Sequence, residues 1–152
     1  MAEITLSCPN VNGGTAVTIH AVSVDYAWKN LTNVTPVPQL YDITCVDFSG
    51  WENPLITVQG MFNVDDLDTN QIRHAHLLSF SKVRWDGTTA NTITLTVPTG
   101  IGATQYNLLA SDGSTTTLKV VVESFNINLN VQAGGEMGHI WNFTLVLRET
   151  AT

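Results

Sequence analysis

The sequence predicts an all-β fold: a β-sandwich or barrel of about eight to ten strands, with one α-helix packed on its flank. Three observations lead to this prediction. Apolar and polar residues alternate along much of the chain, turn-forming residues separate the alternating runs, and only one segment has helical periodicity. Strict alternation indicates a strand with one buried face, because successive side chains leave opposite sides of the pleat. At 152 residues, the chain is expected to form a single domain, 1–152.

The most regular alternation lies between Leu118 and Leu147 and predicts a long β-hairpin. Apolar residues occupy odd positions on both sides of the glycine-rich segment 133–138, and they are expected to face the core. The opposite face is polar and almost uncharged. It comprises Ser124, Asn126, Asn128, Asn130, Asn142 and Thr144. Before Glu123 the apolar residues stand on even numbers, so a β-bulge is predicted at Glu123–Ser124.

Shorter strands are predicted in the rest of the chain. β-branched or alternating runs that end at turn residues place them at 4–6, 16–24, 40–48, 55–62, 93–97 and 106–110. The sequence Gly50-Trp51-Glu52-Asn53-Pro54 is predicted to form a turn, because Gly and Asn-Pro favour turn geometry. Asp112-Gly113 is expected to form a hairpin turn.

Tyr26–Gln39 is predicted to be a loop or an extended arm. It contains Pro36 and Pro38, which cannot donate hydrogen bonds to a β-ladder. A loop of this length in a compact domain usually has a function, most often contact with a partner.

One helix is predicted, from about residue 69 to residue 83. Asp65, Asp66 and Asp68 precede a capping Thr69, while Lys82 and Arg84 stand at the far end, and both charges complement the helix dipole. The apolar side chains expected to face the sheet are Ile72, Ala75, Phe80 and Val83.

Composition excludes several classes of function. Only 12% of the residues are charged, and six basic against thirteen acidic residues give a net charge of −7. Binding of nucleic acid through phosphate requires clustered Lys and Arg, which this chain lacks. No apolar run approaches the ~20 residues of a membrane span, and no secretory signal is expected at the N-terminus. A low-charge surface rich in Thr and Asn is common in proteins that pack against copies of themselves, and also in secreted β-domains.

No metal, cofactor or catalytic site is predicted. His74 and His76 diverge by roughly 200° on a helix, so they cannot share a metal ion there. The segment 66–70 begins like a calcium loop, but Gln71 and Leu77 replace its Gly and its bidentate Glu. Motifs for nucleophilic, phosphate-binding or zinc-dependent catalysis are missing from the sequence. Cys8 and Cys45 are expected to be separate thiols, with a bridge between them as the alternative.

The order of these elements resembles that of the tail tube proteins of tailed bacterial or archaeal viruses, which are related to the tube proteins of contractile injection systems. The resemblance covers most of the chain. It rests on the early strands, the long arm, the Gly50–Pro54 segment before Leu55–Gly60, the helix, and the terminal hairpin that ends in Leu145-Val146-Leu147-Arg148-Glu149-Thr150.

The resemblance implies subunits that form rings, expected to be hexameric, which stack into a tube for DNA passage in the virion. The subunit would be made in the host cytoplasm, and its partners would be copies of itself and other tail proteins. The polar residues of the hairpin would line the lumen or an inter-ring surface, and DNA would pass without specific binding. Contacts to the neighbouring ring are expected from the arm, through Trp28, Leu31, Val34 and Val37.

Two alternatives stay open. A minor tail, tail-tip or capsid-decoration protein would have the same sequence pattern. A non-enzymatic module that binds a glycan or a protein through its loops would instead present aromatic residues in one groove. The tryptophans are Trp28, Trp51, Trp85 and Trp141, of which Trp141 is expected in the core from its alternation pattern.

Overall fold

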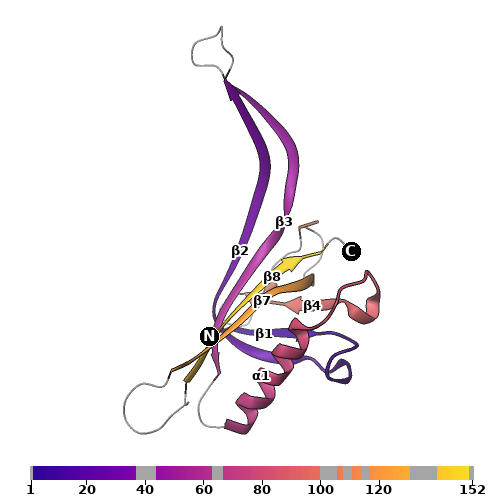
Figure 1. Ribbon diagram of the computed structural model, residues 1–152, viewed down its shortest axis with the longest axis vertical. Helices are drawn as coiled ribbons and strands as arrows, with labels where there is room; N and C mark the ends of the chain where they lie inside the picture. Colours follow the sequence, from indigo (N-terminus) through magenta and orange to yellow (C-terminus); the bar gives the residue numbers. More distant parts are fainter. Residues whose placement is uncertain are drawn as a thin grey trace.

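A computed structural model of the protein describes residues 2–36, 44–62, 67–99, 106–107, 111–113, 117–130 and 140–150. These residues form a mainly β structure in which a six-stranded antiparallel sheet closes into a barrel, accompanied by one α-helix (Figure 1). The prediction of a mainly β fold with one flanking helix is therefore confirmed, and the choice between sandwich and barrel falls on the barrel.

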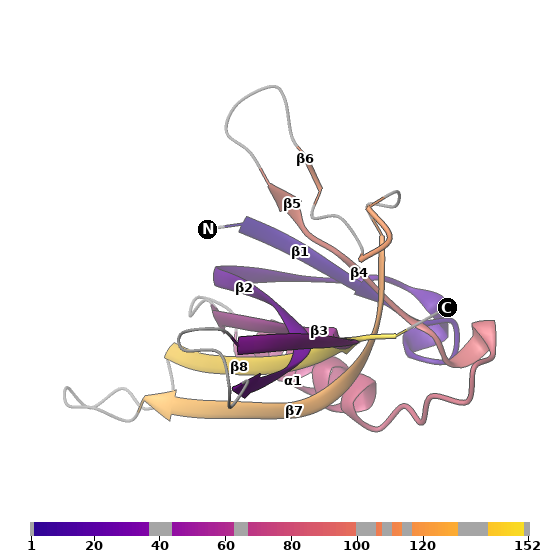
Figure 2. The same cartoon turned by 90° about the horizontal axis from the view of Figure 1, so that it is seen from above.

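The barrel strands follow the order β1-β2-β3-β8-β7-β4. Figure 2 shows β7 curving toward β4, which closes the ring through short pairings with both β1 and β7. The strand bounds are β1 Ala2–Ser7, β2 Val17–Pro36, β3 Thr44–Phe62, β4 Ile93–Thr96, β7 Leu118–Asn130 and β8 Ile140–Glu149. Two short strands, β5 (Pro98–Thr99) and β6 (Tyr106–Asn107), pair separately, and 3₁₀ turns lie at Asn12–Gly14 and Thr89–Asn91.

β2 and β3 are far longer than predicted and extend beyond the barrel as a two-stranded ribbon (Figure 1). β3 pairs with β8 only from Leu55 to Phe62, and farther out it pairs with β2 alone. We call residues 27–36 and 44–54 the arm. Of the two alternatives predicted for Tyr26–Gln39, the loop was wrong for Tyr26–Pro36, which is strand within an extended arm, while residues 37–39 lie outside the described part of the chain.

The predicted turn at Gly50–Pro54 was also wrong, because these residues stay within β3: Gly50 to Glu52 pair with β2, and a bulge lies on each side of them. In the first bulge, Asn53 and Pro54 of β3 both stand opposite Trp28 of β2. In the second, Ser49 is an extra residue of β3 next to Gly50, which pairs with Leu31. A bulge tolerates Pro54 because its extra residues need not donate a ladder hydrogen bond. Turn-forming residues therefore bend the arm instead of ending its strand.

The predicted terminal hairpin is confirmed: β7 and β8 pair in antiparallel orientation, from Val120 opposite Glu149 to Asn130 opposite Ile140. Its register shifts between Val122 and Ser124, which confirms the predicted bulge at Glu123–Ser124. The glycine-rich segment 133–138 lies outside the described residues.

The core fills the barrel interior with apolar side chains from every barrel strand and from the helix. α1 (Leu67–Ser81) packs on β7 and β2, and its Leu77 and Phe80 are completely buried. The helix begins and ends two residues earlier than predicted, and Ala75 is exposed instead of facing the sheet. Val83, beyond the helix end, still packs on the core. Cys8 is a buried free thiol whose Sγ lies 3.4 Å from the Ala90 carbonyl oxygen.

Candidate functional site

The polar residues of the terminal hairpin lie on the outer surface of β7 and β8, and Gln59 and Met61 of the adjacent strand β3 continue this surface. Strand register aligns them in rows across the sheet. One row is Met61–Asn142–Asn128, and the next is Gln59–Thr144–Asn126. We call this surface, together with Ser124, the polar face. None of its residues is charged, so it presents amides and hydroxyls to whatever it contacts.

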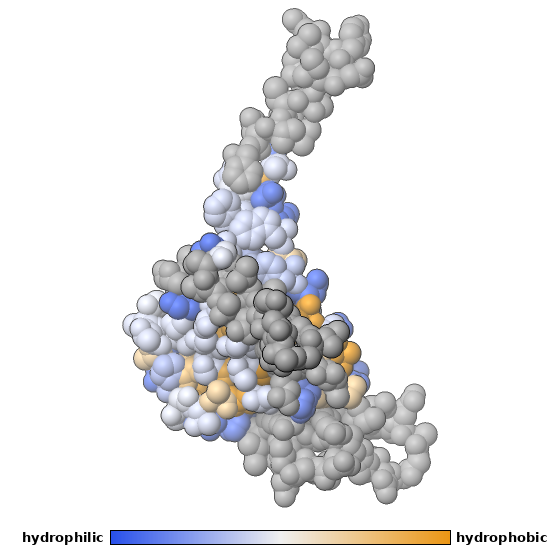
Figure 3. Space-filling view, turned by 180° about the vertical axis from the view of Figure 1, so that it is seen from behind, coloured by the Kyte–Doolittle hydropathy of each residue, from blue (hydrophilic) through white to orange (hydrophobic). Residues whose placement is uncertain are grey.

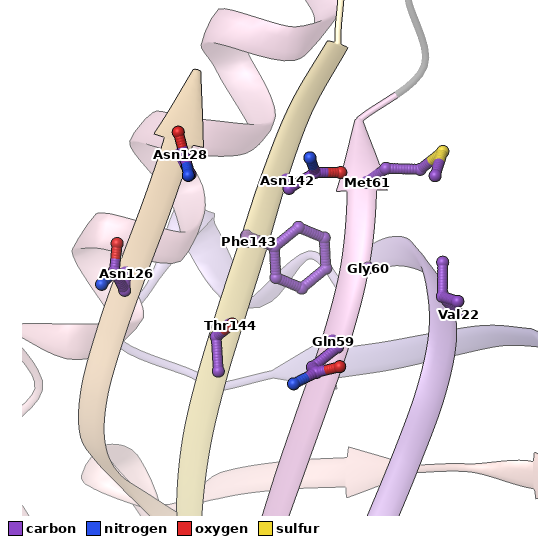
Figure 4. A pocket seen from close by; sticks show the side chains of 9 residues that line it. All are labelled: Val22, Gln59, Gly60, Met61, Asn126, Asn128, Asn142, Phe143 and Thr144. Carbon is purple, nitrogen blue, oxygen red and sulfur yellow. The ribbon is translucent and has the colours of Figure 1, made fainter. Parts of the chain in front are cut away.

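The polar face is hollowed into an open cavity of about 450 Å³ (Figure 4). Gln59, Gly60 and Met61 come from β3, the asparagines and Thr144 come from β7 and β8, and Val22 stands at the edge on β2. Val22 is 59% exposed because the bulge between Ala21 and Ser23 makes it an extra residue on its strand. The ring of Phe143 also lines the cavity, which therefore combines amide and hydroxyl groups with apolar side chains.

Gly60 is required where β2, β3 and β8 meet. A Cβ atom added there would collide with the backbone carbonyl of His20 and would lie 2.6 Å from Cζ of Phe143. The buried ring of Phe143 thus occupies the space that a side chain at position 60 would need. This close approach fixes the position of the polar face relative to the core.

The arm carries apolar side chains that the barrel does not cover. The rings of Trp28 and Trp51 lie side by side, with centroids 5.5 Å apart, and are 43% and 54% exposed. The indole N–H of Trp28 donates to Oδ1 of Asn30 over 2.9 Å, and Leu31 is 38% exposed. In Figure 3, strongly hydrophobic (orange) residues gather mainly on the body, while most of the described arm is white to blue.

Arg148 on β8 connects the base of the arm to the barrel. Its Nε donates to the carboxylate of Glu123, the bulged residue of β7, and its Nη1 donates to the carbonyl oxygen of Asn53 over 2.9 Å. Arg148 therefore joins the bulge of β7 to the bulge of β3. The hydrogen bond that Arg148 donates to Glu123, together with the negative charge of Glu123, raises the pKa of Arg148. Farther out, Lys29 and Glu52 form an exposed ion pair of 3.6 Å.

Glu149 is the one buried charged residue among the described side chains. Its carboxylate accepts hydrogen bonds from the hydroxyl of Tyr26 (3.1 Å) and from both the backbone N–H and the hydroxyl of Ser111 (2.8 Å each). Burial, followed by the charge of Glu149 and the hydrogen bond to it, raises the pKa of Tyr26 to about 12. The hydrogen-bonded carboxylate of Glu149 thus connects β8 to β2 and to Ser111.

The described residues contain neither a cluster of metal ligands nor a helix that could span a membrane. No group of three or more His, Cys, Asp or Glu side chains could hold a metal ion among the described residues. His74 and His76 lie on α1, and the ring of His74 lies 5.9 Å from that of Phe125. Within the same residues, no helix is long and apolar enough to cross a bilayer.

The structure brings together most of the predicted polar residues. Ser124, Asn126, Asn128, Asn142 and Thr144 share one face; for Asn130 only the backbone pairing with Ile140 is described. Of the predicted arm residues, Trp28 and Leu31 are exposed on the ribbon, Val34 lies in β2 without a described side chain, and Val37 is outside the described residues.

The sequence reasoning missed Val22, Gln59 and Met61, which complete the hollow of the polar face. Their strands were recognised as strands, but nothing local shows that β3 pairs with β8. Trp51 was also missed as an arm residue, because the segment around it was taken for a turn.

Comparisons with known proteins do not place the chain in a family: no protein-family model matches it, and no curated protein matches it significantly.

Proposed function

We propose that this protein is a non-enzymatic structural subunit of a viral tail tube, which assembles into stacked rings around a channel for DNA. The observation that carries the proposal is the arm, a two-stranded ribbon with exposed Trp28, Trp51 and Leu31 that projects from a closed barrel (Figure 1). The closed barrel supports the proposal further, as does the resemblance of the order of sequence elements to that of tail tube proteins.

The arm needs a partner for physical reasons. An isolated two-stranded hairpin is marginally stable in water, and three or more strands are usually needed. Among the described residues, neither outer edge of the ribbon pairs with a further strand, and proteins normally cover such edges or close them into a larger sheet. A neighbouring copy that adds strands to the arm and buries its indoles satisfies both requirements. Partner contact of this kind explains why a small domain keeps such a long extension.

The polar face fits a surface past which DNA slides. DNA carries one negative charge per ≈ 1.7 Å of axis, so basic side chains would hold it by phosphate contacts. The rows Met61–Asn142–Asn128 and Gln59–Thr144–Asn126 contain neither Lys nor Arg. Six subunits of charge −7 carry 6 × (−7) = −42, and this negative field also keeps DNA from adhering.

Negative-stain electron microscopy of the purified protein over a range of concentrations tests the proposal. Rings with a central hole, or tubes of uniform width, are the expected result. Rings that never stack would favour the related minor tail, tail-tip or capsid-decoration protein. Dispersed monomers at every concentration would contradict self-assembly as the main function.

The contact between Trp28 and Trp51 favours one further candidate, a module that binds glycans. Exposed aromatic faces commonly receive apolar sugar faces, and these two rings share one surface of the arm. A glycan-array screen of the monomer distinguishes the candidates. Glycan binding that disappears in Trp51→Ala, without any assembly, would favour the binding module over the tube subunit.

A further inference from the structure

A second hollow, of about 400 Å³, lies where α1 ends and is distinct from the polar face. Ser79 and residues 82–84 form one side, and residues 10–12 with Asn91 form the other. The second side is held together internally: the backbone N–H of Asn10 donates to the carbonyl of Ala90 (3.2 Å), and Nδ2 of Asn10 donates to Oδ1 of Asn91 (2.8 Å). We call this the basic hollow, because Lys82 and Arg84 both line it.

The cations of the basic hollow are not neutralised within the subunit. Among the side chains that the structure describes, Lys29 pairs with Glu52 and Arg148 pairs with Glu123, whereas Lys82 and Arg84 have no ion pair. The end of α1 supplies only about half a negative charge, which cannot balance two cations.

The carboxylate closest in sequence, Asp86, is engaged elsewhere. Its Oδ1 accepts from the N–H (2.9 Å) and the hydroxyl (2.6 Å) of Thr88, and its Oδ2 accepts from Nδ2 of Asn91 (2.9 Å). These bonds fix the loop after α1 and direct the carboxylate toward neutral donors. Lys82 and Arg84 therefore remain exposed on a preformed surface.

We propose that the basic hollow binds exposed carboxylates of a second copy of this chain. The chain has thirteen acidic residues against six basic ones, so another copy is a rich source of carboxylates. Asp25 on β2 is one such group: it is exposed and has no ion pair in the described part of the chain. A nucleic acid would be repelled by the net charge of −7, whereas an ion pair between copies needs only local complementarity.

In such a contact, the basic hollow of one subunit meets a different, acidic surface of the next subunit, so the interface is heterologous. Heterologous contacts generate rings when the rotation closes, and open filaments when it does not. The inference therefore rests on the self-assembly proposed above and adds the charge pairing that orients one subunit against the next.

Charge reversal tests this inference. Lys82→Glu and Arg84→Glu should each raise the concentration needed for assembly on the order of tenfold, because a like charge then faces the partner carboxylate. The matched control is Lys119→Glu, which makes the same change from −7 to −9 at a lysine outside the basic hollow. Assembly by light scattering should weaken for the wild type between about 0.1 M and 1 M salt, as the Debye length falls from about 10 Å to about 3 Å.

Carbodiimide cross-linking, which joins an amine to a carboxylate, gives a second readout on assembled wild-type protein. Mass spectrometry should find Lys82 joined to an Asp or Glu peptide of another copy, with isotope-mixed subunits proving the link intermolecular. If the wild type assembles and the Lys82 and Arg84 variants match Lys119→Glu, the basic hollow is not the contact, while the tube proposal stands. If the wild type never assembles, both proposals fail.

Discussion

Gly60 shows how a single residue can determine the position of a functional surface. It lies where β2 approaches β3 closely and where Phe143 of β8 fills the space below. A larger residue would push apart the strands that carry Gln59, Met61 and Asn142. The absence of a side chain at position 60 is thus what permits the continuous polar face.

Gly60→Ala is therefore expected to destabilise the protein by about 2 kcal/mol or more, because a new methyl group would overlap a backbone carbonyl that cannot rotate away. Urea unfolding measures this change. Gly113→Ala, where a Cβ meets nothing within 4 Å, should cost only the strain of its positive φ, about 1 kcal/mol. Equal losses in the two variants would contradict the proposed overlap.

Tyr26 provides a prediction on pH at the same scale. Its pKa in the folded protein, about 12, exceeds its ordinary value of 10.0 because the phenol is partly buried against Glu149. The neutral phenol therefore contributes stability that is complete below pH 10 and is lost as the pH rises toward 12.

Ultraviolet titration of the folded protein should show a tyrosine step near pH 12 that is missing in Tyr26→Phe. Tyr26→Phe should also make unfolding less dependent on pH between about 10 and 12 than it is in the wild type. A native titration curve with every tyrosine ionised near pH 10 would show that the contact with Glu149 does not form.

At the scale of elements, bulges convert turn-forming residues into a bent strand. The local sequence of β3 contains Gly50 and Pro54, which normally predict a chain reversal. The partner strand β2 overrides this preference by pairing on both sides of each irregularity. By contrast, the bulge at Glu123 was predictable, because it shifts the apolar pattern within one strand.

Arg148 is expected to hold the base of the arm in place. In Arg148→Lys the charge is kept, but one ammonium replaces the planar fork that reaches both Glu123 and the Asn53 carbonyl. Exchange of the backbone amides in residues 50–55, where Pro54 has none, should accelerate about three- to tenfold, while global stability changes by about 1 kcal/mol or less.

The matched control for that experiment is Lys29→Gln, which removes the exposed ion pair with Glu52 farther along the arm. It should leave exchange at residues 50–55 nearly unchanged, since exposed pairs contribute little. Similar acceleration in both variants would mean that Arg148 has no special role at the arm base.

At the scale of the whole molecule, the stability of the barrel is expected not to depend on the arm. The buried core lies in the barrel, whereas the described arm residues beyond the pair of Ala27 and Leu55, 28–36 and 44–54, pair only with each other. Substitutions on the arm surface should therefore change assembly without unfolding the barrel.

Trp28→Thr combined with Trp51→Thr is expected to raise the concentration needed for ring or tube formation at least about tenfold, because large aromatic side chains dominate protein interfaces. Circular dichroism should show that the barrel remains folded. Leu78→Ala removes a comparably exposed apolar side chain from α1 and should leave assembly unchanged. Normal assembly of the double variant would remove the arm from the proposed interface.

The sequence by itself determined the mainly β class, the terminal hairpin with its bulge, the single helix, and the polar residues of β7 and β8. All of these follow from periodicity within one segment, which is set by side-chain direction on a strand or helix. Only the tertiary structure decided that β2 and β3 form a continuous arm, that Gln59 and Met61 join the polar face, and that β4 closes the barrel. Those features depend on pairing between distant segments, whose register is set by core packing and the position of bulges and not by local preference.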